Sequence, residues 1–132
     1  MANQQLDVLA IGDVVTDAFI KLLDDEARVD KEASGPRLSM PYATKVPFDQ
    51  VVVVPAVGNA SNASVAFARL GLKSGLLSNV GSDQSGRQIL ATLHKNKVDN
   101  RFVHINHGKA SNYHYVLWYK EDRTILIKHE EY

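Results

Sequence analysis

The hexapeptide VGNASN at residues 57–62 combines residue types that can bind a small polar ligand. Glycine lets a ligand approach the backbone closely, and the free N–H groups at a helix start attract an anion or an oxygen-rich ligand. The amides of Asn59 and Asn62 both donate and accept hydrogen bonds, which suits a neutral polyol. An asparagine-capped helix after a glycine turn explains the same residues without a ligand. Both interpretations stay open on these residues alone.

Two carboxylates form the second candidate feature. The run DVLAIG at residues 7–12 predicts a buried strand that ends on a glycine, and Asp13 and Asp17 follow it. A strand that ends in carboxylates and then restarts can line a cleft. A turn followed by a surface strand is the alternative, because spacing alone does not distinguish the two.

A helix must hold the hexapeptide. Apolar residues at positions i, i+3, i+4 and i+7 predict an amphipathic helix that ends before Gly71. Its predicted buried face is formed by Ala63, Ala66, Phe67 and Leu70. Its candidate N-terminal caps are Asn59, Ser61 and Asn62.

The elements after this helix repeat the same order. A strand over residues 74–80 leads to a second helix over residues 82–97, capped by Ser82 or Asp83. Its apolar face is formed by Ile89, Leu90 and Leu93. Alternation of strands and helices is typical of parallel βαβ units and predicts an α/β fold.

The remaining segments differ from this pattern. Residues 24–44 have mixed charge, two prolines and weak periodicity, which predicts a long loop or flap, and residues 49–55 read as a strand that proline ends. The runs at residues 101–105, 113–120 and 123–129 predict three further strands in antiparallel arrangement.

Composition excludes several classes of protein. Fifteen basic side chains balance fifteen acidic ones in 132 residues, which argues against a nucleic-acid binder, and the absence of cysteine excludes disulfides and thiolate zinc sites. The apolar runs are shorter than a membrane span, and the first residues, MANQQLD, lack the pattern of a signal peptide. We therefore expect a cytoplasmic protein with no membrane partner.

Histidines and aromatic residues near the C-terminus suggest weaker sites. His104, His107 and His114 could suggest a metal site, but residues three apart on a strand face opposite sides, so we expect ordinary histidines. The aromatic residues could suggest a base-stacking platform, but without a basic field we expect sheet packing. They are Tyr113, Tyr115, Trp118 and Tyr119.

Three motifs at matching spacings resemble one family. Gly12 is followed by Asp17 five residues later, the loop at residues 57–62 opens a helix that ends Ala-Arg-Leu-Gly, and residues 80–86 read Val-Gly-x-Asp-x-x-Gly. Together they resemble the PfkB carbohydrate kinases, also called ribokinase-like kinases. The resemblance covers nearly all of residues 1–132 and identifies them as a single N-terminal fragment of such a kinase domain.

The resemblance implies a partial ribokinase-like fold, in which antiparallel strands form a lid over the acceptor. Here the lid strands would be residues 17–23, 48–54 and 101–128. It also implies that Asp17 accepts hydrogen bonds from sugar hydroxyls and that Gly58, Asn59 and Asn62 hold the rest of the sugar. Lid closure would exclude water from phosphoryl transfer.

Two substitutions depart from the family pattern. Val57 replaces the first glycine of the pair, where we expect it to disfavour positive φ and narrow the approach to the backbone. Val15 stands where members often carry a sugar-binding asparagine. We expect Val57 either to impair sugar binding or to change the acceptor, and Val15 to make ribose a less certain substrate.

The sequence also lacks the family's catalytic Gly-Ala-Gly-Asp motif and any Walker A or GxGxxG loop. The family uses ATP and Mg²⁺, and we expect neither to bind fully to this chain. Three hypotheses follow. In the first, the chain is the acceptor-binding portion of an ATP-dependent sugar or nucleoside kinase and is not competent alone. In the second, it is a truncated, non-enzymatic module that folds by self-association, with at most residual sugar binding. In the third, it has a partner-binding or structural role. An unpaired sheet edge predicts a homo-oligomer.

Overall fold

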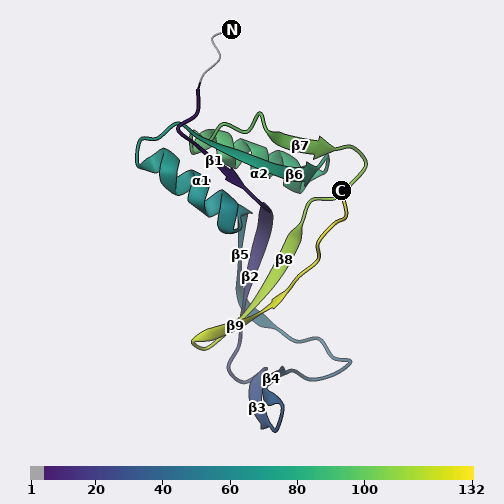
Figure 1. Cartoon of the computed structure of the whole chain (residues 1–132). Helices are drawn as coiled ribbons and strands as arrows, with labels where there is room; N and C mark the ends of the chain where they lie inside the picture. The colour runs from purple at the N-terminus through teal and green to yellow at the C-terminus, as the bar shows by residue number, and fades with distance from the viewer. Residues whose placement is uncertain (1–4) are drawn as a thin grey trace.

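The computed structural model describes residues 5–132, so the first four residues of the N-terminal MANQQLD lie outside the described part. In this described part, five strands precede the first helix, one strand separates the two helices and three strands follow the second (Figure 1). The elements are β1 (Val8–Ile11), β2 (Val15–Leu22), β3 (Arg28–Glu32), β4 (Gly35–Ser39), β5 (Phe48–Val57), α1 (Asn59–Arg69), β6 (Ser74–Gly81), α2 (Gln84–Lys95), β7 (Val103–Asn106), β8 (Tyr113–Tyr119) and β9 (Asp122–Leu126). A membrane-spanning helix is absent from residues 5–132, whose longest helix has 12 residues.

A three-stranded parallel sheet forms the upper part of the molecule in Figure 1, with strand order β1-β6-β7. Both helices pack against the face of β6 that carries Leu76 and Val80, which are fully buried. The opposite face carries Leu9, Ile11 and Leu77, which are 39%, 70% and 41% exposed. The sheet is therefore covered on one face by α1 and α2 and open on the other.

Helix α2 agrees with the sequence prediction. The Asp83 carboxylate caps it by accepting a hydrogen bond from the Gly86 N–H at 2.9 Å. Ile89 and Leu93 are fully buried in the core, and Leu90 packs against it. Apolar spacing predicted this helix correctly because Ile89, Leu90 and Leu93, its large apolar side chains, are the ones that pack in the core.

Helix α1 buries a different face from the one predicted. Its core-facing side is formed by small residues, namely Ala60, Ser61, Ser64, Val65 and Ala68. Ala66 and Leu70 are exposed instead, with Leu70 at 79%. The small face allows close approach to β1, because a Cβ added at Gly12 would lie 3.0 Å from the Ala60 Cβ. Close backbone packing, and not side-chain hydrophobicity, decides the orientation of this helix.

A second, four-stranded sheet extends below the first in Figure 1 and is called the lid sheet here. Its order is β5-β2-β8-β9, in which β2 pairs antiparallel with β5 and parallel with β8. β9 pairs antiparallel with β8. Strand β2 follows β1 across residues 12–14, so the central lid strand leaves directly from the parallel sheet.

The predicted arrangement of the C-terminal strands needs correction. The first run, expected in the lid over residues 101–128, contains β7, which pairs parallel with β6 in the other sheet. Only β8 and β9 join the lid, and β8 is parallel to β2. Short strands rich in β-branched and aromatic residues have similar sequences. The sheet to which each one belongs depends on its pairing partner, which is distant in the chain.

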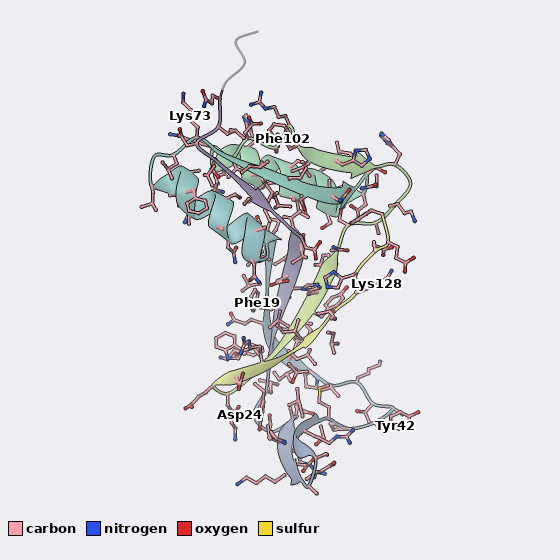
Figure 2. The ribbon with its side chains drawn as sticks, viewed as in Figure 1. Phe19, Asp24, Tyr42, Lys73, Phe102 and Lys128 are labelled. Atoms are coloured by element: carbon pink, nitrogen blue, oxygen red, sulfur yellow. The ribbon has the colours of Figure 1, made fainter. Side chains whose placement is uncertain are left out.

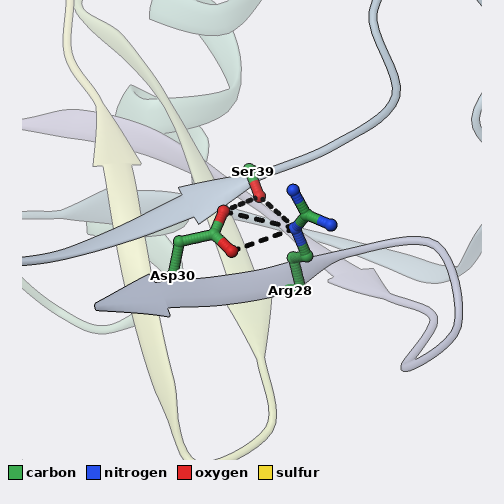
Figure 3. A network of polar contacts seen from close by, with 3 residues as sticks. All are labelled: Arg28, Asp30 and Ser39. Atoms are coloured by element: carbon green, nitrogen blue, oxygen red, sulfur yellow. Dashed lines mark hydrogen bonds and ion pairs between the residues drawn. The ribbon is translucent and has the colours of Figure 1, made fainter. Parts of the chain in front are cut away.

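The predicted loop over residues 24–44 contains a β-hairpin, β3 paired with β4. Arg28, Asp30 and Ser39 form a polar network across it, in which the Arg28 Nε and the Ser39 hydroxyl both donate to the Asp30 carboxylate (Figure 3). The ribbon is mostly solvent-exposed on both faces, so its sequence lacks the apolar alternation of a half-buried strand. Tyr42, in the following loop, is 96% exposed and projects away from the rest of the chain (Figure 2).

Candidate functional site

Asp17 lies on β2, one of the two inner strands of the lid sheet, close to where that sheet leaves the parallel one. Its register partners are Val54 on β5 and His114 on β8. The chain reaches it from the carboxyl end of β1 through Gly12 and Asp13. Ligands of open α/β sheets bind beside the carboxyl ends of the strands. Asp17 is thus placed at the edge where a ligand is expected.

The Asp17 carboxylate faces an imidazole. The Nδ1 of His114 lies 3.3 Å from the Asp17 Oδ1, and the two side chains are 14% and 20% exposed. The Asp17 Oδ1 and the His114 Nε2 are both buried without a hydrogen-bond partner. Burial raises the pKa of Asp17 above its ordinary value, and the facing His114 opposes this rise.

The C-terminal segment lies beside this pair. The His129 ring meets the His114 ring edge to face, with centroids 5.2 Å apart, and the His129 Nδ1 lies 3.8 Å from the Asp13 Oδ2. The Glu130 N–H donates to the Asn112 Oδ1 at 2.8 Å and holds the segment against the start of β8. Two carboxylates and two imidazoles therefore gather at one end of the lid sheet.

Gly58 is required by the backbone at the start of α1. Its φ is 112°, and a Cβ added there would lie 2.9 Å from the carbonyl oxygen of Asp13. The Gly58 carbonyl accepts the first helical hydrogen bond, from the Asn62 N–H at 2.8 Å. The glycine thus lets the helix start lie against the residues between β1 and β2.

Val57 does not carry the strain expected of it. The positive φ values at this junction fall on Ala56, at 61°, and on Gly58, and not on Val57. Val57 pairs with Val15 as an ordinary strand residue. The buried Ala56 takes the left-handed conformation instead, and its carbonyl accepts a hydrogen bond from the Ser61 hydroxyl at 2.6 Å.

Asn59 and Asn62 are exposed on the first turns of α1. The predicted asparagine cap is wrong, since Gly58 occupies the N-cap position and no side chain caps the helix. Neither amide side chain is hydrogen-bonded to another described residue. Asn62 borders a surface depression that also includes Val54, the strand partner of Asp17. Both amides are therefore free to bind a ligand, and neither is hydrogen-bonded to Asp17.

His114 was expected to be an ordinary histidine, and the sequence patterns did not place it beside Asp17. Its position beside Asp17 depends on the pairing of β2 with β8, which are far apart in the chain. The other two histidines considered for a metal lie elsewhere, His104 on β7 and His107 in the turn after it. Within residues 5–132 no group of three or more His, Cys, Asp or Glu side chains could hold a metal ion. The described residues therefore do not fit a site for Mg²⁺.

The sequence over residues 33–131 matches the family described as pfkB family carbohydrate kinase. The chain belongs to this family. It is 29% identical over 96 residues to the bifunctional protein HldE of Koribacter versatilis. Its fold resembles that of the PfkB protein from Polaromonas sp. JS666, with a TM-score of 0.67 and 20% identity. An uncharacterized sugar kinase from Pyrococcus horikoshii, solved in complex with ATP, gives a TM-score of 0.61 at 24% identity.

This PfkB-family chain spans a minor part of the proteins that it matches. The alignment with HldE covers 73% of the chain and 17% of the relative. The two solved structures are matched over 95% and 92% of the chain, but over 35% and 33% of their own lengths. The mixed parallel and antiparallel architecture is thus a partial ribokinase-like fold.

Proposed function

We propose that this chain supplies the acceptor-binding side of a cytoplasmic, ATP-dependent sugar or nucleoside kinase, which transfers a phosphoryl group to an alcohol. The observation that carries the proposal is the Asp17 carboxylate, which is largely buried where β2 leaves the parallel sheet and whose Oδ1 accepts no hydrogen bond from another described residue, although the His114 Nδ1 lies 3.3 Å away. A buried polar atom without a partner is costly, which favours a ligand hydroxyl as its missing partner.

The chemistry of the site suits a neutral polyol. One carboxylate can accept hydrogen bonds from two neighbouring hydroxyls, and bonds to an ionised acceptor are the stronger ones. Gly58 keeps the helix start free of a side chain, and Asn59 and Asn62 offer amides for further hydroxyls. The lid sheet would shield the acceptor hydroxyl from water, which competes for the phosphoryl group.

Catalysis needs parts that these residues do not contain. The 132 residues carry no Gly-Ala-Gly-Asp motif, and phosphoryl transfer depends on positioning and charge stabilisation around the nucleotide. We therefore propose that the chain alone binds an acceptor without turning ATP over.

Calorimetry on the purified chain with a panel of pentoses, hexoses and nucleosides tests this function. We expect binding of at least one compound, its loss in Asp17→Ala, and no loss in Asp122→Ala, because Asp122 is exposed on β9. ATP hydrolysis or transfer is measured on the same samples. Equal binding by Asp17→Ala would reject the assigned role of Asp17, and turnover by the 132-residue chain would show that the missing motif is not needed.

Self-association is a second candidate function, supported by the open face of the parallel sheet. Leu9, Ile11 and Leu77 are exposed there, and three consecutive valines of β5, Val51–Val53, are about half-exposed on the lid. Exposed apolar surface of this kind favours association with a second copy, so we propose a homodimer or higher oligomer. Light scattering at micromolar concentration is expected to show it, and Ile11→Lys to weaken it. A monomeric wild-type chain would reject this candidate.

A further inference from the structure

A close contact between a carboxylate and an imidazole joins two neighbouring strands of the lid sheet, β2 and β8. Asp17 on β2 and His114 on β8 are direct register partners, so both side chains project from the same face of the lid sheet. Their nearest polar atoms, the Asp17 Oδ1 and the His114 Nδ1, lie 3.3 Å apart. This is an ion-pair distance, but the two groups lack the alignment of a hydrogen bond.

The surroundings of the pair contain few other charges. From β5 the partner at the same level is Val54, which is uncharged. From the C-terminal segment the His129 ring contacts the His114 ring edge to face, and the carboxylate of Asp13 lies beyond it, 3.8 Å from the His129 Nδ1. The His114 imidazole is therefore the ionisable group that faces Asp17 across the sheet, and its ring contacts the His129 ring edge to face.

We propose that His114 is a positioning residue for the acceptor site, holding the Asp17 carboxylate ionised and oriented toward the hydroxyls of a bound polyol. The inference rests on the proposed function for its ligand and on the β2–β8 geometry for its mechanism. Burial disfavours the charged form of Asp17, and the facing imidazole opposes this effect. An ionised carboxylate accepts hydroxyl protons with both oxygens, whereas a protonated one spends one oxygen on its own proton.

The two nitrogens of the imidazole allow a sharp choice of variants. His114→Asn places an amide N–H near the position of Nδ1, which faces Asp17. His114→Gln places its N–H near the position of Nε2, which faces away. We expect the asparagine variant to keep most of the positioning effect, and the glutamine and alanine variants to lose it. His104→Ala is the matched control, because His104 is exposed on β7.

The first measurement needs no ligand and follows the Asp17 carboxyl carbon by NMR during an acid titration of the 132-residue chain. The pKa of Asp17 is expected to rise further in His114→Ala and His114→Gln, less in His114→Asn, and not at all in His104→Ala. An Asp17 titration that is the same in wild type and in all His114 variants overturns the proposal, provided that dispersed lid resonances show that the variants fold.

The second measurement is the affinity for the polyol or nucleoside found by calorimetry. We expect at least a tenfold loss in His114→Ala and His114→Gln, substantial recovery in His114→Asn, and no change in His104→Ala. Unchanged affinity in every His114 variant overturns the positioning role while leaving the proposed function intact. If wild type binds no compound of the panel, the proposed function fails, and the carboxyl titration alone decides the relationship between His114 and Asp17.

Discussion

The hydroxyl of Ser111 donates a hydrogen bond to the Asp83 carboxylate at 2.7 Å and so joins the start of α2 to the segment that enters β8. The same carboxylate accepts from the Ser111 N–H at 3.1 Å and from the Gly86 N–H at 2.9 Å. One side chain therefore caps a helix of the parallel-sheet layer and anchors a strand of the lid.

Asp83→Ala is expected to lower the free energy of unfolding by about 2 kcal/mol at neutral pH, since it removes a helix cap and two hydrogen bonds to a charged group. Burial alone would raise the pKa of Asp83, but the hydrogen bonds from Ser111 and Gly86 outweigh it and hold the pKa below its ordinary value. This stabilisation is present above that value and is lost as the pH falls through the folded-state pKa. Urea unfolding at several pH values checks this prediction. The difference in the free energy of unfolding between wild type and Asp83→Ala must shrink as the pH falls. Asp122→Ala, on exposed β9, should change stability by less than about 0.5 kcal/mol.

Asp17→Asn is expected to stabilise the chain at neutral pH while removing the proposed ligand site. Because burial raises the pKa of Asp17 above its ordinary 3.8, the folded state holds the proton more tightly than the unfolded state. The contribution of Asp17 to stability is therefore full below pH 3.8 and is lost as the pH rises through the folded-state pKa. The non-titrating variant should have a higher Tm than wild type at pH 7, and the difference should vanish near pH 3. A lower Tm at pH 7 would contradict this.

Gly58→Ala is expected to cost about 3 kcal/mol, because φ is 112° and the new methyl group would lie 2.9 Å from the Asp13 carbonyl oxygen. Gly35→Ala separates the two causes. Gly35 has a similar φ of 115° but open space around it, so only the backbone cost of about 2 kcal/mol remains. Thermal and urea unfolding of both variants measure the difference. Equal losses would show that the contact with Asp13 is unimportant.

Both helices end in a Schellman motif, and the two motifs differ in their left-handed residue. Gly71 has φ of 91° after α1, and Lys97 has φ of 61° after α2. Lys97→Gly is expected to stabilise the chain by about 0.5–1 kcal/mol, and Gly71→Lys to destabilise it by about 1 kcal/mol. Lys95→Gly, inside the last turn of α2, is the matched control and should destabilise by about 1 kcal/mol. Chemical unfolding checks all three, and a loss of stability in Lys97→Gly would refute the argument.

Sequence patterns predicted the elements whose signals are local. Strand β1, helix α2 with its Asp83 cap, and Gly71 after α1 all agree with the structure. The buried face of α1 was predicted wrongly, because small residues such as Ser61 and Ser64 pack it closely and carry no apolar signal. The hairpin of β3 and β4 was missed for a different reason. Most of its side chains on both faces are exposed, so its sequence lacks the alternation of apolar and polar residues that marks a half-buried strand.

The candidate site was predictable only in part. Gly58 has a positive φ at the start of α1, which glycine adopts readily. The local motif at residues 57–62 was enough to predict the need for a glycine there. His114 could not be assigned, because its contact with Asp17 arises from a strand register that joins distant segments. The positive φ that we expected to be a problem at Val57 is found at Ala56, one residue earlier. The residue types at these two positions do not show which of them takes this conformation.

The central position of β2 has a consequence for the order of folding. Its antiparallel partner β5 is complete once residue 57 is available, but its parallel partner β8 ends at residue 119. A chain emerging from the ribosome must therefore hold one edge of β2 unpaired while both helices and all of β6 and β7 are synthesised. Pairing β8 with β2 closes a long loop, which has an entropic cost and slows folding. We therefore expect the lid sheet to be completed late. Until then the unpaired edge of β2 is exposed to other nascent chains.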